Sequence, residues 1–346
     1  MTMLTEKQRL LAALSKQPAD RPPVICPGGM MNAAIVDVMN SSNQTLPAAH
    51  SDAVLMANLA YAVHNHTGFE NFGLPFCMTV EAELLGSEID LGTFTCEPKI
   101  SREVFSSATQ VEYKDISTIL TAGRIPVVCQ AASILSTEYP DIPVIGSLTG
   151  PVSTAASIID PIPFLKDLRK NAPAAHRVFD YVTGLLIGFA HKLIDHGATV
   201  IAIGDPTATG EILGPKLFNE YAVTYINKLI AAVQHRNVPV IVHICGNLNS
   251  VKPLIASLKA NAISTDAIVN LKQLKAEFPQ LTTMGNISTY LLEYGPPEKV
   301  ALQARNLLAQ GIDIIAPACG LSTSSALANI QAMTHTVKGI QANERT

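Results

Sequence analysis

Two short segments far apart in the chain carry the side chains of a metal site. His243 and Cys245 lie two positions apart at the end of an apolar run. Alternate residues of a strand point to the same side, so the imidazole and the thiol would project together. Cys319 ends another strand-like run and precedes Gly320. One nitrogen and two sulfur ligands form a zinc set with one open position, which is typical of a catalytic zinc ion. Ordinary buried cysteines and a hydrogen-bonded core histidine can have the same spacing. The spacing alone therefore does not distinguish a metal site from buried core residues.

Polar or polarizable residues follow several other apolar runs. Asp205 comes after Ile201–Gly204, where a carboxylate can handle protons or anchor substrate, or simply cap the next helix. Asp266 is either a fourth metal ligand or the cap of a loop. Asn286 either orients a polar ligand or braces a turn. Met30 follows a Pro-Gly-Gly stretch and either lines an apolar mouth or fills the core.

The elements that must position these residues alternate between strands and helices. Short β-branched runs that stop at Gly, Pro or Asp predict buried parallel strands, and the longer amphipathic stretches between them predict helices. About eight such units in one continuous domain, 1–346, favour a closed (β/α)8 barrel, with an N-terminal helix within residues 1–20 packed on it. The ends of barrel strands share one mouth, where chemistry is expected. The predicted strands are Pro23–Cys26, Asn71–Pro75, Pro143–Leu148, Thr199–Gly204, Pro239–Ile244, Ala262–Thr265, Leu281–Gly285 and Ile312–Ala316.

Composition excludes several classes of protein. With 48% hydrophobic and 15% charged residues, the 346-residue chain is not disordered. The 24 Lys and Arg against 28 Asp and Glu give no basic excess, so we expect no nucleic-acid partner. No apolar run reaches the ~18 residues of a membrane span. Six scattered cysteines without a secretion signal predict reduced thiols in a cytoplasmic protein.

Six segments, taken together, resemble the methylcobalamin:coenzyme M methyltransferases, a branch of the uroporphyrinogen decarboxylase superfamily. They cover essentially the whole chain. The His-x-Cys-Gly-Asn motif with its distant Pro-x-Cys-Gly partner is specific to the zinc-dependent, thiol-methylating branch, whereas Asp-Arg-Pro-Pro is shared by the wider superfamily. The segments are LSKQPADRPP (14–23), GLPFCMTVEAE (73–83), IGSLTGP (145–151), IAIGDPTA (201–208), HICGN (243–247) and APACG (316–320).

This resemblance implies a uroporphyrinogen decarboxylase-like barrel with Zn2+ held by His243, Cys245 and Cys319. Asp266 stands where relatives can place a carboxylate on the zinc when substrate is absent. The implied reaction moves a methyl group from a methylcorrinoid (cobalamin) to a thiol, most simply coenzyme M, held as a zinc-bound thiolate. We expect the corrinoid to arrive on a separate corrinoid protein, since the chain shows no further domain to hold it.

The remaining site residues are expected around that centre. Asp205 and Asp266 are the candidate catalytic carboxylates. Met30, Asn247 and Asn286 are the candidates for contact with the corrinoid or the acceptor.

Three alternatives stay open at this point. The acceptor is tetrahydrofolate or another thiol; or the chain is a uroporphyrinogen decarboxylase; or it is a corrinoid-binding barrel with a vestigial site. Decarboxylation needs an arginine-rich cradle for a substrate with many carboxylates, and here only Arg21 lies near the corresponding Val24–Met30 segment. The intact His243, Cys245 and Cys319 set argues against a vestigial site.

Overall fold

The computed structural model describes residues 3–340, and its centre is a parallel sheet. Six strands are hydrogen-bonded in the order β1-β4-β5-β6-β7-β8. Every residue of β4, β6 and β7 is buried, as expected for strands covered on both faces. The bounds are Phe72–Leu74 for β1, Val144–Thr149 for β4, Val200–Gly204 for β5, Val240–Ile244 for β6, Ala262–Thr265 for β7 and Thr283–Met284 for β8.

Two further segments close the sheet into a barrel, although neither is long enough to be a regular strand. A parallel bridge joins Val24 to Ile315, and another joins Met284 of β8 to Ile314. On the other side, the Asn71 side chain accepts a bond from the Cys26 amide (2.9 Å) and donates one to the Cys26 carbonyl (2.8 Å). The predicted (β/α)8 barrel is therefore confirmed. Its first and last positions form a seam held by few backbone bonds.

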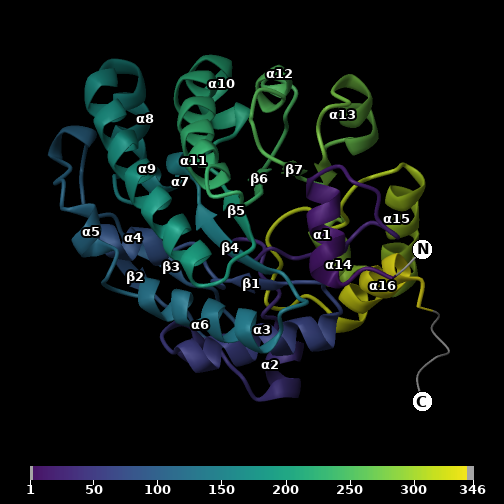
Figure 1. The fold of residues 1–346 in the computed structure, drawn as a ribbon. Coiled ribbons are helices and arrows are strands. Elements are labelled where there is room, and N and C mark those ends of the chain that lie inside the picture. The colour runs from purple at the N-terminus through teal and green to yellow at the C-terminus, as the bar shows by residue number, and fades with distance from the viewer. Residues whose placement is uncertain (1–2, 341–346) are drawn as a thin grey trace.

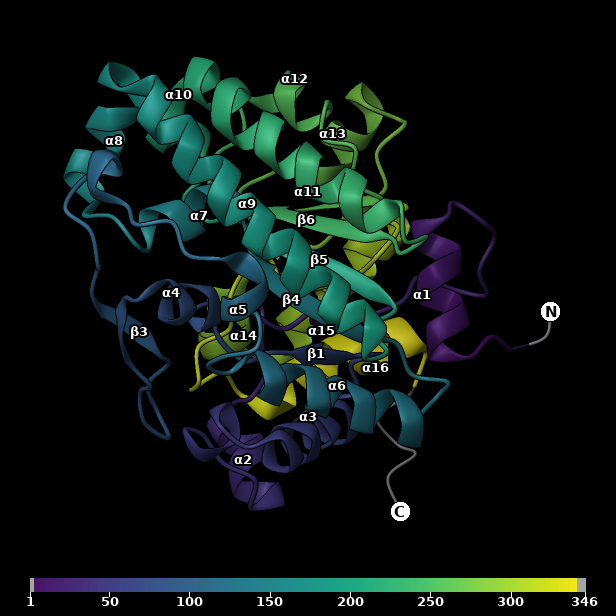
Figure 2. The ribbon, with the colours of Figure 1, turned by 60° about the vertical axis from the view of Figure 1, so that its left-hand side comes forward.

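Helices surround this sheet (Figures 1 and 2). The longest is α9, Ala172–Asp195, which packs on β4, α7 and α11. Among residues 3–340, no helix is both long and apolar enough to cross a membrane. The others are α1 Glu6–Leu14, α2 Val36–Ser42, α3 Ala53–Thr67, α4 Val80–Leu85, α5 Ile116–Ile119, α6 Ile125–Glu138, α7 Pro151–Ala156, α8 Pro161–Lys170, α10 Gly210–Leu217, α11 Thr224–Gln234, α12 Lys252–Ile255, α13 Leu271–Glu277, α14 Thr289–Tyr294, α15 Pro297–Ala309 and α16 Leu327–Lys338.

A small antiparallel hairpin reaches over the mouth end of the barrel. It consists of β2, Glu88–Asp90, and β3, Lys99–Arg102. Figure 2 shows β3 and α1 on opposite sides of the sheet. The Asn32 amide donates to the Glu97 carboxylate (3.2 Å), and the Thr323 hydroxyl donates to the Thr95 carbonyl (2.8 Å). The hairpin tip therefore contacts both the loop after the first barrel position and the loop after the last.

A buried carboxylate attaches the N-terminal segment to the barrel. Helix α1 begins with a capping box, in which the side chains of Thr5 and Gln8 each accept a hydrogen bond from the other's backbone amide. Behind it, Glu70 is fully buried and accepts bonds from Arg9 (2.7 Å), Arg21 (2.7 Å) and the Val24 amide (2.9 Å). One carboxylate thus joins the first helix, the Asp-Arg-Pro-Pro turn and the start of the barrel.

Glu70→Gln is expected to lower the free energy of unfolding by about 3 kcal/mol, the low end of the range for breaking a buried ion pair, because Arg21 loses its counter-charge while Arg9 keeps Asp20. The control is Glu88→Gln, which breaks an exposed pair with Arg102 and should cost less than about 1 kcal/mol. Urea unfolding of both variants measures the difference. Equal losses would contradict this role of Glu70.

Candidate metal centre

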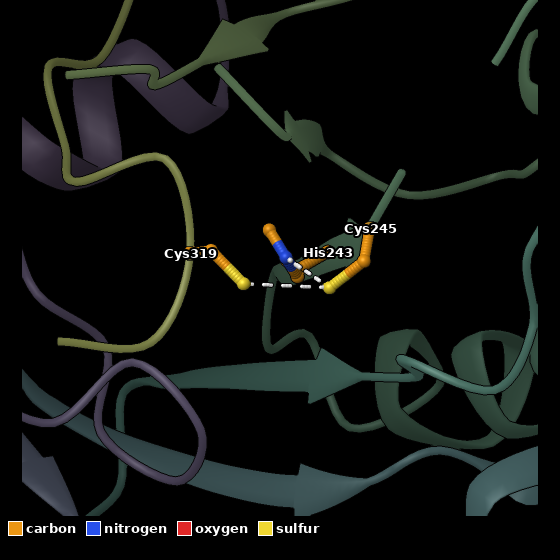
Figure 3. A group of neighbouring side chains, drawn as sticks. All are labelled: His243, Cys245 and Cys319. Carbon is orange, nitrogen blue, oxygen red and sulfur yellow. Dashed lines mark hydrogen bonds between the residues drawn. The ribbon is translucent and has the colours of Figure 1, made fainter. Parts of the chain in front are cut away.

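Three donor side chains converge at the mouth of the barrel (Figure 3). His243 is the fourth residue of β6, and Cys245 follows the strand directly. The His243 Nε2 lies 3.1 Å from the Cys245 sulfur, which lies 3.5 Å from the Cys319 sulfur. The three donor atoms are within 4.8 Å of one another. The sequence prediction that the distant Cys-Gly would lie beside the His-x-Cys pair thus agrees with the observed placement.

The donor set fits a zinc ion in both chemistry and spacing. Two sulfurs that each lie ~2.3 Å from a tetrahedral zinc ion are about 3.8 Å apart. The observed separation of 3.5 Å between the Cys245 and Cys319 sulfurs is close to that value. Both cysteines are half-buried and His243 is buried, so an ion held there would keep one face toward the mouth.

Glycine is needed beside Cys319 for this approach. A Cβ atom on Gly320 would lie 2.8 Å from the Met30 carbonyl oxygen, too close for any side chain. The loop after the last barrel position can therefore pass directly against the Met30 backbone and bring Cys319 over the mouth. This close approach explains why glycine follows Cys319 in the sequence.

The two sulfurs share their protons unequally. The pKa of Cys319 is lowered, chiefly because the Cys245 thiol donates a hydrogen bond to its sulfur and because His243 faces it. The pKa of Cys245 is raised by the same hydrogen bond and by burial. A metal ion bound by both sulfurs must displace the thiol proton of Cys245.

Asp266 lies near these donors but is not one of the three that converge. Its carboxylate accepts a bond from the Ile268 amide (3.1 Å), which closes a turn at the start of the β7–α13 loop. Asn286 is buried and donates to the carbonyls of Asp266 (2.8 Å) and Val269 (2.9 Å). Of the two roles open from the sequence, Asn286 here braces a turn, and that turn carries Asp266.

Asp205 is fully buried against the N-terminus of α7. Its carboxylate accepts bonds from the amides of Val152 (3.0 Å) and Ser153 (2.8 Å) and from the Ser153 hydroxyl (2.7 Å). Burial raises its pKa to about 6, against these bonds, which lower it. The Asp205 carboxylate therefore caps a helix, which is one of the uses open to it from the sequence. The capped helix is α7, which comes earlier in the chain, and not the helix that follows Asp205.

The two other expected contact residues lie at different depths. Met30 lines a small cavity under the metal ligands, together with Met31, Ser147 and His243. Asn247 is exposed, and its side chain accepts a bond from the Asn249 amide (2.9 Å), which shapes the loop after Cys245.

Two buried groups at the mouth were not singled out as site residues from the sequence. Ser264 lies on β7 with its hydroxyl 2.9 Å from the His243 Nδ1. Glu81 of α4 accepts bonds from the amide (2.8 Å) and hydroxyl (3.0 Å) of Thr149 at the end of β4. A cross-strand partner such as Ser264 leaves no local signal. The sequence indicated Glu81 only through the family resemblance, because Glu81 lies within the segment 73–83.

The comparisons with known proteins agree with this geometry. The family model for uroporphyrinogen decarboxylase (URO-D) matches residues 5–340. The chain belongs to the uroporphyrinogen decarboxylase family. It is 34% identical over 340 residues to the methylcobamide:CoM methyltransferase MtbA of Methanosarcina acetivorans, with 98% of this chain and 99% of that one covered. It is 32% identical to the methylcobamide:CoM methyltransferase MtaA of Methanosarcina barkeri, covering 96% and 97% of the two chains.

The similarity extends to the three-dimensional structure. A methyltransferase from Methanosarcina mazei superposes with a TM-score of 0.90 at 31% identity, over 97% of this chain and 99% of that one. By contrast, the uroporphyrinogen decarboxylase of Chlorobaculum parvum is 27% identical over only 148 residues, 42% of this chain. Within the family, the similarity is therefore strongest toward the methyltransferases.

Asp205 is expected to make stability fall as pH rises. The pKa of Asp205 is about 6 in the folded protein and ~3.9 in the unfolded chain. Its contribution to the free energy of unfolding is therefore fully present below pH ~4 and is lost as the pH rises through about 6. Relative to Asp205→Asn, the wild type should lose on the order of 2 kcal/mol between pH 4.5 and 7.5. Urea unfolding at several pH values measures this difference.

The control for that experiment is Asp195→Asn. Arg236 lowers the pKa of Asp195, so the stability from that group is lost only below pH ~4. The difference in stability between the wild type and Asp195→Asn should therefore not change with pH across the same range. Parallel curves for the wild type and Asp205→Asn would show that Asp205 is ionised in the folded state throughout.

Proposed function

We propose that this protein transfers the methyl group of a methylated corrinoid to the thiol of coenzyme M, with a zinc ion held by His243, Cys245 and Cys319. The observation that carries the proposal is the convergence of these three donors at the barrel mouth, with one face open. It occurs in a chain whose nearly full-length relatives are methylcobamide:CoM methyltransferases. Two thiolates must stay reduced to bind the ion, which suits the cytoplasm.

The donor set suits a sulfur nucleophile. A zinc ion bound there would lower the pKa of a thiol from its usual ~8.5 and supply a thiolate at neutral pH. Cys245 and Cys319, as thiolates, cancel the charge of the ion, and His243 adds none. The site has little net positive charge, so the bound acceptor thiolate remains nucleophilic.

The reaction is a displacement at the methyl carbon. A sulfur–carbon bond forms and the cobalt–carbon bond breaks, with the electron pair left on cobalt as Co(I) and the thiol proton passed to solvent. Sulfur, carbon and cobalt must lie in line, so holding the two reactants in position is a large part of the catalysis. The chain contributes a fixed sulfur position at the mouth and, through Met30, an apolar lining beneath it.

The open mouth also suits a donor that arrives on another protein. Ile268 on the β7–α13 loop is 67% exposed and Tyr290 at the start of α14 is 73% exposed. Ile268 follows the mouth end of β7 and Tyr290 follows that of β8, so both lie toward the end of the barrel that carries the metal ligands. Exposed large apolar side chains beside an active site are typical of a binding surface. We assign them to contact with a separate corrinoid protein.

The metal centre is tested with Cys319→Ala. The wild type purified without added metal should contain about one zinc ion per chain and form methyl-coenzyme M from methylcobalamin and coenzyme M. The variant should lose both the zinc and the reaction, while Cys129→Ala, a buried cysteine in α6, should retain both. Elemental analysis and product detection by mass spectrometry provide the readouts.

The acceptor is read from the same assay. A zinc-loaded wild type that forms no thioether would contradict the proposed function. Transfer to tetrahydrofolate, or to another thiol in preference to coenzyme M, would leave the corrinoid chemistry and change the acceptor.

The docking surface is tested with the double variant Ile268→Ala/Tyr290→Ala. We expect the KM for a methylated corrinoid protein to rise about tenfold or more, because exposed apolar anchors are removed. Free methylcobalamin does not need that surface and should lose far less rate. Leu302→Ala, an exposed leucine on the outer helix α15, is the matched control. Equal effects of the double variant on both donors would assign these residues to the barrel mouth itself.

A further inference from the structure

The His243 ring has a hydrogen-bond partner on the side away from the two sulfurs. Strands β6 and β7 are paired so that His243 stands directly opposite Ser264. The Ser264 hydroxyl lies 2.9 Å from the His243 Nδ1, while Nε2 faces the Cys245 sulfur at 3.1 Å. Both residues are buried, with 3% of His243 and none of Ser264 exposed. The contact is therefore fixed by strand register and shielded from water.

The direction of this hydrogen bond follows from the zinc ligation proposed for Nε2, because a neutral imidazole that binds a metal through Nε2 carries its hydrogen on Nδ1. The Ser264 hydroxyl also lies 4.0 Å from the Met31 sulfur, which can only accept. A hydroxyl has one hydrogen, and when the Ser264 oxygen accepts from the ring, that hydrogen is free to point toward Met31. The Ser264 oxygen then offers a lone pair to the Nδ1–H of His243. This bond favours the tautomer with its hydrogen on Nδ1, which leaves the lone pair of Nε2 to bind a metal ion on the side of Cys245 and Cys319.

We propose that Ser264 is the positioning residue of the metal centre. This inference rests on the proposed zinc site and adds to it the group that selects the His243 tautomer and ring orientation. A hydroxyl differs from a carboxylate here, because it accepts the Nδ1–H bond without adding negative charge. The charge of the two-thiolate, one-imidazole set is therefore left unchanged by its outer partner.

The chain offers a matched control one residue away. Thr265 is on the same strand and is equally buried, but its hydroxyl has no hydrogen-bond partner. Thr265→Val removes a buried hydroxyl from β7 without touching His243, whereas Ser264→Ala removes the one that faces the ring. Any difference between the two variants reports the contact with His243 rather than the loss of a polar atom from the strand.

The test is zinc affinity, measured by competition with a chromophoric chelator, together with the absorption spectrum of the Co2+-substituted protein. Ser264→Ala should weaken zinc binding by about 10–100-fold, the usual effect of losing an outer hydrogen bond to a ligand histidine. It should also shift the Co2+ ligand-field bands. Ser264→Thr, which keeps the hydroxyl, should restore both. Thr265→Val should bind zinc within about twofold of the wild type.

The outcomes separate this inference from the proposed function. If Ser264→Ala, folded by circular dichroism, binds zinc as tightly as the wild type and leaves the Co2+ bands in place, the role of Ser264 is overturned. The same holds if Thr265→Val weakens binding equally, or if the wild type binds no zinc. A wild type that binds zinc but transfers no methyl group would overturn the function and leave the affinity result for Ser264 standing.

Discussion

The barrel closes through a bridge between Val24 and Ile315, and the metal centre depends on that closure. His243 and Cys245 come from the middle of the sheet, whereas Cys319 follows the last barrel position. Only a closed sheet brings these segments, 74 residues apart between Cys245 and Cys319, to a sulfur–sulfur distance of 3.5 Å. The chemistry of the site is thus a consequence of the topology, since no local stretch of chain carries all three donors.

The other polar groups at the mouth have mainly architectural roles. Asp205 caps α7, Glu81 holds the end of β4, and Asn286 braces the loop that carries Asp266. Each is buried and has its bonds within the protein. A buried polar group that lacked these partners would cost free energy, so the loops around the metal ligands are fixed by the same bonds that satisfy their side chains.

The sequence was sufficient for the parts of the fold that repeat a pattern. Ala262–Thr265 is both the predicted strand and β7, and the other central strands agree within a residue or two. The amphipathic stretch Pro215–His235 predicts a helix, and the backbone is helical from Pro215 to Gln234, with a π-helical turn, Phe218–Val223, between α10 and α11. The sequence pattern did not indicate that α10 begins earlier, at Gly210, with a kink at Gly214. The β2–β3 hairpin gave no signal, since its short strands are largely exposed. Ser264 could not be found either, because its role depends on cross-strand register, which a single sequence does not reveal.

The seam between the first and last barrel positions is held less by the sheet than by polar contacts at its two ends. Near the base, Glu70 joins Arg9, Arg21 and the Val24 amide. At the mouth, the tip of the β2–β3 hairpin contacts Asn32 on one side and Thr323 on the other. Whatever bridges the sulfurs of Cys245 and Cys319 ties the last barrel position across the mouth to β6. A group that binds both sulfurs would therefore also stabilise the closed barrel against opening at this seam.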